Sequence, residues 1–203
     1  MNILIVLAHP RDNSLNAALA YRLADQLNKD HTVVLNDLYR DKFDPILKEN
    51  ELLDINYFSE DIQKYCNDLM AADCLIIVHP NWWGAPPAMM KGWIDRVIRL
   101  NVGYGFNDNG EGEPIKLLKL KYFFVFNTSN TLQERETSVF RDPLENIWKN
   151  CIAGFLGSPH FLRKMFNIVA TSTQGEREVW INGCCDQVIE VLLSFDSNGG
   201  NNL

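Results

Sequence analysis

Ile3-Leu4-Ile5-Val6-Leu7-Ala8 lies near the start of the chain and is apolar at every position. A strand buried on both faces has this pattern, because its alternating side chains meet a core on either side of the sheet. Leu15, Leu19, Leu23 and Leu27 then recur every fourth residue, which predicts a helix with one apolar edge. A fully buried strand followed by an amphipathic helix is a typical beginning of a parallel α/β sheet.

Strand-like and helix-like runs continue to alternate along the rest of the chain. We expect further strands at Thr32–Leu35, Cys74–Val78, Tyr122–Phe126 and Phe166–Ala170, and helices at Phe58–Ala71, after Pro87, from Asp142 and after Thr173. Asp142 and Thr173 are each followed three residues later by a glutamate, a common helix start. The alternation predicts a three-layer, doubly wound α/β sandwich with a five-stranded parallel sheet, and the short first crossover favours the strand order 2-1-3-4-5.

Length and charge bound the class of protein. The 203 residues suit one domain, which we assign to residues 1–195, with a tail at 196–203 that we expect to be disordered. The start lacks a signal-peptide pattern and no apolar run is long enough to span a membrane, so we expect a cytoplasmic protein without membrane insertion. The net charge of −7 comes with no basic stripe, which argues against a nucleic-acid partner.

Several polar residues receive structural interpretations. The five cysteines include no C-x-x-C pair and are best explained as buried free thiols, and no His/Cys/acid group has the spacing of a zinc site. His160 is interpreted as a loop residue. The mixed charges of Glu134-Arg135-Glu136 are interpreted as a solvated face.

Ligands of an open parallel sheet bind beyond the carboxyl ends of the strands, where the strand order reverses. This rule selects the loops after Ala8, Val78 and Phe126. In the first loop, Ser14 and Asn16 lie at the start of a helix, where backbone N–H groups and the helix dipole attract an anion. His9 and Arg11 would add positive charge. A phosphate or pyrophosphate fits this loop, and a serine that only caps the helix fits it equally well.

The second loop contains Trp82, Trp83 and Gly84 among three prolines. Such a loop is stiff and offers a large aromatic surface, which suits a flat conjugated ring. Adjacent side chains diverge, so packing of both tryptophans in the core is the weaker interpretation.

The same stretch resembles the diagnostic segment of the flavodoxin-like NAD(P)H:quinone oxidoreductases, with the pattern P-x-x-W-x-x-x-P-A-x-x-K-G-W-x-[DE]-R-V. Its fixed positions are all matched, by Pro80, Trp83, Pro87, Ala88, Lys91, Gly92, Trp93, Asp95, Arg96 and Val97. The opening pattern L-A-H-x-x-x-x-S-x-N is also matched, at Leu7, Ala8, His9, Ser14 and Asn16. The resemblance runs from the start of the chain to about Phe106 and then weakens.

The resemblance implies a homodimer that binds FAD, or alternatively FMN, and takes hydride from NADH or NADPH. A quinone, nitro or azo compound would then accept it in the same pocket. The residues implied in binding are His9, Ser14, Leu15 and Asn16 for the flavin phosphates, Pro80, Asn81, Trp82, Trp83 and Gly84 for the ring, and Tyr104, Gly105 and Phe106 for the substrate. No catalytic side chain is implied, because flavin itself carries the redox chemistry.

The third loop departs from the family. Asn127-Thr128-Ser129-Asn130 replaces a Thr-Thr-Gly-Gly turn. These small polar residues could still bind the pyrimidine edge of the flavin, and an ordinary capped turn is an equally good interpretation. A tyrosine and a histidine that follow this turn in some members have no clear match, so the group that would stabilise the reduced ring is not identified.

Two alternative functions fit the same fold. An electron carrier with tightly held FMN is the first, and His9 and the paired tryptophans fit it poorly. The second is a regulatory flavoprotein, similar to the ancillary subunits of potassium efflux systems.

Overall fold

A five-stranded parallel sheet forms the centre of the computed structural model, which describes residues 1–54, 57–107 and 113–196. Its order is β2-β1-β3-β6-β7, and every neighbouring pair is parallel. The strands are β1 (Asn2–Leu7), β2 (Thr32–Asp37), β3 (Cys74–Pro80), β6 (Tyr122–Thr128) and β7 (His160–Phe166). In sequence order of the sheet strands this is 2-1-3-4-5, so the predicted order is confirmed.

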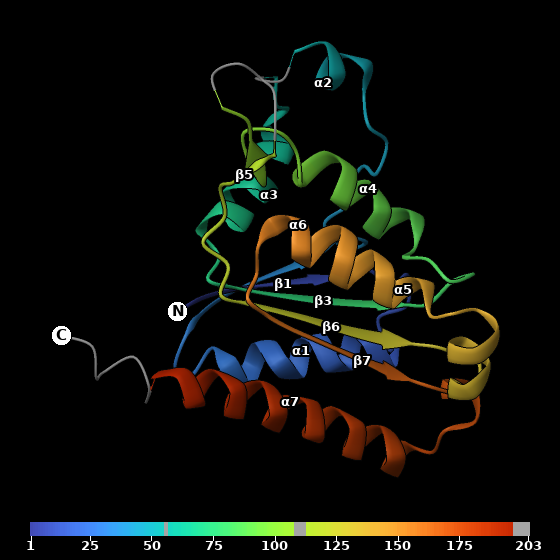
Figure 1. Cartoon of the computed structure of the whole chain (residues 1–203). Helices are drawn as coiled ribbons and strands as arrows, with labels where there is room; N and C mark the ends of the chain where they lie inside the picture. Colours follow the sequence, from blue (N-terminus) through green and yellow to red (C-terminus); the bar gives the residue numbers. More distant parts are fainter. Residues whose placement is uncertain (55–56, 108–112, 197–203) are drawn as a thin grey trace.

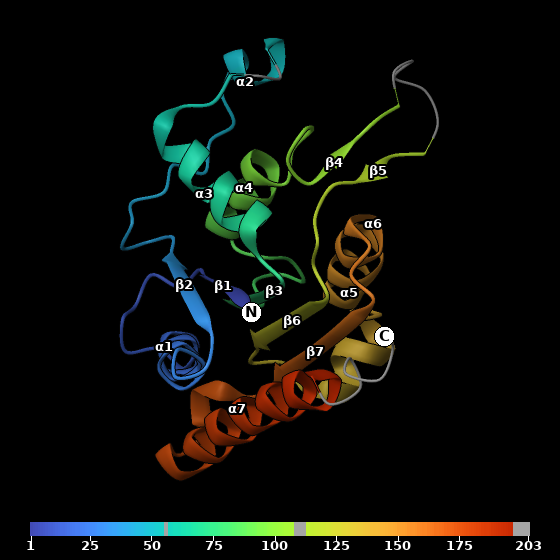
Figure 2. The ribbon, with the colours of Figure 1, turned by 90° about the vertical axis from the view of Figure 1, so that its left-hand side faces the viewer.

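Helices cover both faces of the sheet (Figures 1 and 2). One face carries α3 (Glu60–Ala71), α4 (Ala88–Val97) and a continuous helical run made of α5 (Pro143–Glu145), the π-helical η2 (Asn146–Ala153) and α6 (Gly154–Leu156). The other face carries α1 (Leu15–Leu27) and α7 (Gln174–Asp196). The smaller elements are α2 (Glu49–Leu53), the two-stranded β4 (Tyr104–Gly105) and β5 (Ile115–Lys116), the π-helical turn η1 (Arg135–Val139) and the 3-10 turn η3 (Val169–Thr171).

The core consists of two apolar clusters, one on each face. Ile3 to Ala8 are all buried, and Leu15, Leu19, Leu23 and Leu27 pack beneath the sheet, as the leucine spacing predicts. The second cluster includes Trp93 of α4 and Trp148 of η2, both fully buried. Burial on both faces holds β1 and β3 rigidly, so the loops that follow them start from fixed positions.

The fifth strand differs from the prediction. It runs from His160 to Phe166, and the predicted segment Phe166–Ala170 is wrong: it contains Ile168 with a φ of 55° and part of η3. β7 lies at an edge of the sheet, and most of its residues are only partly buried. Polar residues are tolerated there, so the strand has no continuous apolar run by which the sequence could identify it. His160 therefore begins a strand and stacks on Tyr122, at 5.5 Å between ring centroids, so its interpretation as a loop residue is also wrong.

The cysteines are free thiols in the structure, and four of them are buried; the interpretation as a buried thiol is wrong for Cys151, which is exposed. Burial raises the pKa of the Cys66 thiol to about 11, because the thiolate would be poorly solvated. Within the described residues, no helix is long and apolar enough to cross a membrane. The predicted disordered tail, apart from its first residue, lies outside them.

Candidate functional site

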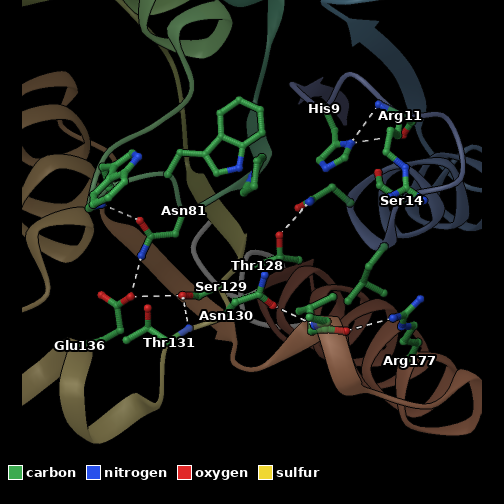
Figure 3. Close-up of a pocket in the computed structure, with 18 of the residues that line it drawn as sticks. His9, Arg11, Ser14, Asn81, Thr128, Ser129, Asn130, Thr131, Glu136 and Arg177 are labelled. Atoms are coloured by element: carbon green, nitrogen blue, oxygen red, sulfur yellow. Dashed lines mark hydrogen bonds between the residues drawn. The ribbon is translucent and has the colours of Figure 1, made fainter.

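The first loop, which follows β1, contains polar groups that lie at the start of α1. The Ser14 hydroxyl oxygen accepts a hydrogen bond from the backbone N–H of Ala17 at 3.1 Å, so Ser14 does cap the helix. The Arg11 guanidinium donates to Asn13 at 3.2 Å on the same side of the site. Figure 3 shows His9, Arg11 and Ser14 together on one wall. A helix N-terminus with an arginine beside it is suited to binding an anion.

His9 is held in a defined orientation within this wall. Its Nδ1 accepts a hydrogen bond from the backbone N–H of Arg11 at 3.1 Å. Partial burial is the main reason that the pKa of His9 is lowered; the hydrogen bond with the backbone of Arg11 opposes this, and the positive charge of Arg11 adds to it. Nδ1 also lies 3.3 Å from the carbonyl oxygen of Arg11, so the backbone of Arg11 fixes the orientation of the ring in either tautomer.

The second loop is a tight turn that presents both indoles. The backbone N–H and C=O of Trp82 exchange hydrogen bonds with those of Ala85, both at 3.1 Å. The central residues Trp83 and Gly84 have φ values of 57° and 74°, which is the requirement of a type I′ turn. Trp82 is 43% exposed and Trp83 fully exposed, so the prediction that the pair is not packed in the core is confirmed.

Asn81 fixes this turn to the rest of the site. Its Oδ1 accepts from the backbone N–H of Gly84 at 2.9 Å, and its Nδ2 donates to Oε1 of Glu136 at 2.9 Å. Its own backbone N–H donates to the carbonyl of Thr128 at 2.6 Å. The loop after β3 is thus attached to the loop after β6 through both backbone and side chain, as Figure 3 shows for the side chains.

The third loop is attached to its neighbours by side chains. Thr128 Oγ1 accepts from the Asn16 amide at 2.8 Å, which joins this loop to α1. Ser129 Oγ donates to Glu136 at 3.1 Å, and Asn130 Oδ1 accepts from the backbone N–H of Ala170 at 2.8 Å. These contacts bring the carboxyl ends of β1, β3 and β6 into one constellation.

The three loops converge on a single pocket with a volume of about 1150 Å³. Twelve of the residues predicted for the site line it: His9, Ser14, Leu15, Asn16, Pro80, Asn81, Trp82, Trp83, Gly84, Thr128, Ser129 and Asn130. The prediction that the start of α1 and the tryptophan turn meet at one pocket is therefore confirmed. Its lining combines the polar wall of His9, Arg11 and Ser14 with exposed indoles, and the rings of His9 and Trp82 are 6.4 Å apart between centroids. This combination is suited to a ligand that carries both a phosphate and a flat ring.

Four residues predicted for the site lie elsewhere. The side chain of Asn127 turns away from the pocket into a buried polar cluster. Tyr104 and Gly105 form β4, and none of Tyr104, Gly105 and Phe106 is among the pocket-lining residues of this chain. Tyr104 instead packs against Phe155, at 5.0 Å between ring centroids.

The interpretation of Glu134-Arg135-Glu136 as a solvated face is wrong for Glu136. Glu136 is 2% exposed and lines the pocket. The apolar residues of the same segment do not indicate that Glu136 is buried, because Leu132 and Val139 are themselves more than 60% exposed. Sequence reasoning also did not assign several further residues to the site: Asn13, Thr131, Phe140, Pro143, Val169, Ala170 and Arg177. Most of them follow β6 and β7, where family patterns were absent.

A second polar cluster lies beneath the pocket. His79 is fully buried, and its Nε2 accepts from Trp148 Nε1 at 2.9 Å and from Asn127 Nδ2 at 2.8 Å. Its Nδ1 donates to the carbonyl of Pro80 at 2.8 Å. Arg163 in turn donates to Asn127 Oδ1 at 2.7 Å and to Asp142 at 2.9 Å. Burial lowers the pKa of His79 to about 4, so the ring is neutral near pH 7.

The strand order and the position of the pocket define a doubly wound α/β protein with a pocket at the reversal of strand order, where proteins of this class bind ligands. The chain belongs to the family described as having a flavodoxin-like fold, whose model matches residues 1–176.

Relatives agree with this assignment. The chain is 37% identical over 146 residues to an uncharacterized NAD(P)H oxidoreductase of Haemophilus influenzae, a match that covers 68% of this chain and 70% of that protein. It is 32% identical over 123 residues to NAD(P)H dehydrogenase [quinone] 1 of Rattus norvegicus, covering 51% of this chain and only 45% of the rat protein. The solved NAD(P)H:quinone oxidoreductase of Methanothermobacter marburgensis superposes with a TM-score of 0.80 at 22% identity, over 92% of this chain and 96% of that one, and shares the fold.

Proposed function

We propose that this chain is a flavin-dependent NAD(P)H:quinone oxidoreductase. The overall reaction would be NAD(P)H plus a quinone plus one proton giving NAD(P)⁺ and the hydroquinone. The observation that carries the proposal is the convergence of the α1 start and the exposed indole turn on one pocket of about 1150 Å³. The names of the relatives from Haemophilus influenzae and Rattus norvegicus support the same activity.

The residues of the pocket fit a flavin nucleotide. Ser14, Leu15 and Asn16 at the start of α1, with His9 and Arg11, would hold its phosphates. The ring would lie against the turn at residues 80–84 and the loop at residues 128–130. When bound, flavin would supply the two-electron redox chemistry, while the protein supplies binding and orientation. FAD is the proposed flavin because His9 matches the family pattern, and FMN is the alternative.

Asn16 adds a second argument for a polar ligand. Its Oδ1 is buried without a hydrogen-bond partner among the described residues, although its Nδ2 is bound to Thr128. A buried acceptor without a partner costs about 1–3 kcal/mol, and a ligand that donates to it would remove that cost. Phosphate oxygens only accept hydrogen bonds, so Asn16 Oδ1 would bind a hydroxyl group of the flavin nucleotide while the backbone N–H groups at the start of α1 bind its phosphates.

The proposal includes a homodimer with the pocket at the subunit interface. Trp83 is fully exposed, and Val139 and Phe140 beside the pocket are 63% and 44% exposed. Tyr104, Gly105 and Phe106 do not line the pocket of their own chain, so they could contact substrate only in the pocket of a second copy. Sedimentation of the wild-type protein and of a Phe140→Glu variant tests this, because a monomeric wild type would contradict it.

We also propose a cytoplasmic location. Cys66, Cys74, Cys184 and Cys185 are buried unpaired thiols, which fits a reducing compartment. NADH and NADPH are available as electron donors there. Quinones are the proposed acceptors, with nitro and azo compounds as further possibilities for the same flat slot.

The deciding experiment is a visible spectrum of the purified protein, with mass identification of any released chromophore. We expect a flavin band, or its recovery after addition of FMN or FAD, and rapid oxidation of NADH or NADPH with menadione. A protein that binds neither flavin would contradict the proposal. Flavin binding with negligible turnover would instead favour an electron carrier or a regulatory flavoprotein.

A further inference from the structure

Glu136 is a buried acid at the end of the pocket opposite to the α1 start. Its side chain lies below Asn81 and beside Ser129, on the opposite side of the site from His9, Arg11 and Ser14 (Figure 3). It is 2% exposed and forms no ion pair within the described part of the chain. It belongs to the π-helical turn η1, a type of helix that occurs often at functional sites.

The two carboxyl oxygens of Glu136 have different surroundings. Oε1 accepts two hydrogen bonds, from Asn81 Nδ2 at 2.9 Å and from Ser129 Oγ at 3.1 Å. Oε2 is buried and has no hydrogen-bond partner among the residues that the structure describes. Burying a polar oxygen without a partner is costly, and the cost is larger for a charged group. If Glu136 served only to connect the loops after β3 and β6, the two hydrogen bonds of Oε1 would be sufficient.

Asn16 and Glu136 are both pocket-lining residues with an unpartnered buried oxygen. An ionised carboxylate only accepts hydrogen bonds, so a ligand that satisfies Oε2 must present a donor. On the ring of a flavin, the polar pyrimidine edge offers one such donor, the imide N3–H. Glu136 lies at the end of the pocket where the proposed function positions that ring.

We propose that Glu136 is a ligand-binding residue whose Oε2 accepts a hydrogen bond from the imide N–H of the bound flavin ring. This inference rests on the proposed function. It assigns Glu136 a second task in addition to the contacts of Oε1, which hold Asn81 and thereby the Trp83-Gly84 turn. The residue would select for rings that carry an unsubstituted imide.

Two glutamine variants separate binding from structural support. Glu136→Gln keeps an oxygen that can accept from Asn81 and Ser129, and it replaces the second oxygen by an N–H₂ group that cannot accept. Glu134→Gln is the matched control, since it removes the same charge from an exposed position two residues earlier. Glu136→Asp is a second test variant, which keeps the charge and draws both oxygens back by one methylene.

The experiment is a titration of ligand-free protein with whichever of FMN and FAD the wild type binds, and with its N3-methyl analogue. Flavin fluorescence reports binding without any turnover. We expect the wild type and Glu134→Gln to prefer the unmethylated flavin by about tenfold or more, because the loss of a hydrogen bond to a charged group weakens binding by about that factor. Glu136→Gln should bind the unmethylated flavin about tenfold more weakly and lose most of the preference, and Glu136→Asp should fall between them.

The outcomes distinguish the two proposals. A wild type that binds neither flavin would overturn the proposed function and the role of Glu136 together. If the wild type binds flavin and Glu136→Gln keeps the full preference against the methylated analogue, the methyl group is excluded by shape alone. In that case the role of Glu136 is overturned while the proposed function stands. Circular dichroism of each variant confirms that it is folded, and Glu136→Asp gives the same comparison if Glu136→Gln does not fold.

Discussion

Two buried polar clusters lie side by side at the carboxyl edge of the sheet, and they differ in how completely their groups are paired. The His79 cluster consists of His79, Asn127, Trp148, Arg163 and Asp142, and none of its buried side-chain nitrogen or oxygen atoms lacks a partner. The Glu136 cluster consists of Glu136, Asn81 and Ser129, and one of its carboxyl oxygens is unpartnered.

This difference distinguishes a cluster that supports the structure from a cluster that is suited to binding a ligand. A fully paired polar cluster rigidifies its surroundings, whereas a partly paired one costs free energy until something completes it. The His79 cluster joins β3, β6, β7 and the helical run from residue 143, and only the Glu136 cluster has side chains that all line the pocket. Variants of the first should therefore mainly change stability, and variants of the second should mainly change ligand binding.

The largest effect is expected from Arg163→Met. Arg163 is 5% exposed at its side chain and donates to Asn127, Asp142 and Glu145. Its removal leaves the amide oxygen of Asn127 without a donor and takes the ion pair from the partly buried carboxylate of Asp142, which keeps only its hydrogen bond from the backbone N–H of Glu145. We expect the free energy of unfolding to fall by about 4 kcal/mol. Urea denaturation measures the loss.

The control for this prediction is Arg22→Met. Arg22 contacts Glu178 and Asn182 at the surface, with 38% of its side chain exposed, and should contribute less than about 1 kcal/mol. Equal losses in the two variants would contradict the view that the His79 cluster is the main polar support of this edge.

Acidification should weaken the same cluster through His79. Burial, and to a lesser extent the charge of Arg163, lower the pKa of His79 from 6.5 to about 4. The unfolded chain therefore binds a proton as the pH falls below 6.5 while the folded chain does not. The stability that His79 contributes is complete above pH 6.5 and is lost progressively down to pH 4, by about 3 kcal/mol.

The measurement is the free energy of unfolding at several pH values between 7 and 4, for the wild type and for His79→Gln. The variant keeps an acceptor for Trp148 and cannot titrate, so its stability should fall by about 3 kcal/mol less than that of the wild type. His31→Gln, at a partly exposed position before β2, is the control for the substitution itself. A wild type and a His79→Gln variant with parallel pH profiles would show that His79 is not the group responsible.

Much of the fold could be predicted because its signals are local. β1 and β3 are buried on both faces, so their apolar runs are continuous, and the leucine spacing of α1 needs no other part of the chain. β7 could not be delimited in this way, since Arg163 and Lys164 interrupt its apolar pattern. Those two residues are tolerated because the strand lies at an edge, which is a property of the sheet and not of the segment.

The residues of the candidate site can likewise be divided into those that local sequence predicts and those that it does not. The tryptophan turn and the start of α1 could be predicted, since composition and helix capping act within a few residues. The inward position of Glu136 could not, because it depends on a π-helical turn and on contacts with Asn81, 55 positions away. The family comparison assigns Asn127 to the pocket together with its neighbours, but its side chain turns away because it is bonded to His79 and to Arg163 on β7, contacts that a local pattern does not reveal.

Glu136→Gln should have a smaller and opposite effect on stability. In the ligand-free protein it neutralises a buried carboxylate that forms no ion pair among the described residues, while an amide oxygen still accepts from Asn81. We expect the free energy of unfolding to rise by about 1 kcal/mol, because burying an uncompensated charge is costly. Urea denaturation without flavin measures it. A loss as large as that of Arg163→Met would mean that the two clusters do not differ in role.

The smallest effect on stability is expected at Trp83, in the turn that the Glu136 cluster holds. Its φ of 57° is unfavourable for a tryptophan, whereas asparagine before Gly84 is a preferred pair for a type I′ turn. Because the indole is fully exposed, Trp83→Asn loses no core packing and should raise the free energy of unfolding by about 0.5–1 kcal/mol. The same variant should weaken flavin binding or raise the KM for menadione, since an aromatic wall of the pocket is removed.

Trp82→Asn is the control: Trp82 is more than half buried and has no positive φ, so its replacement should bring no gain in stability. If Trp83→Asn destabilises the ligand-free protein, the indole has a structural role that its exposure in one chain does not reveal, such as burial against a second copy.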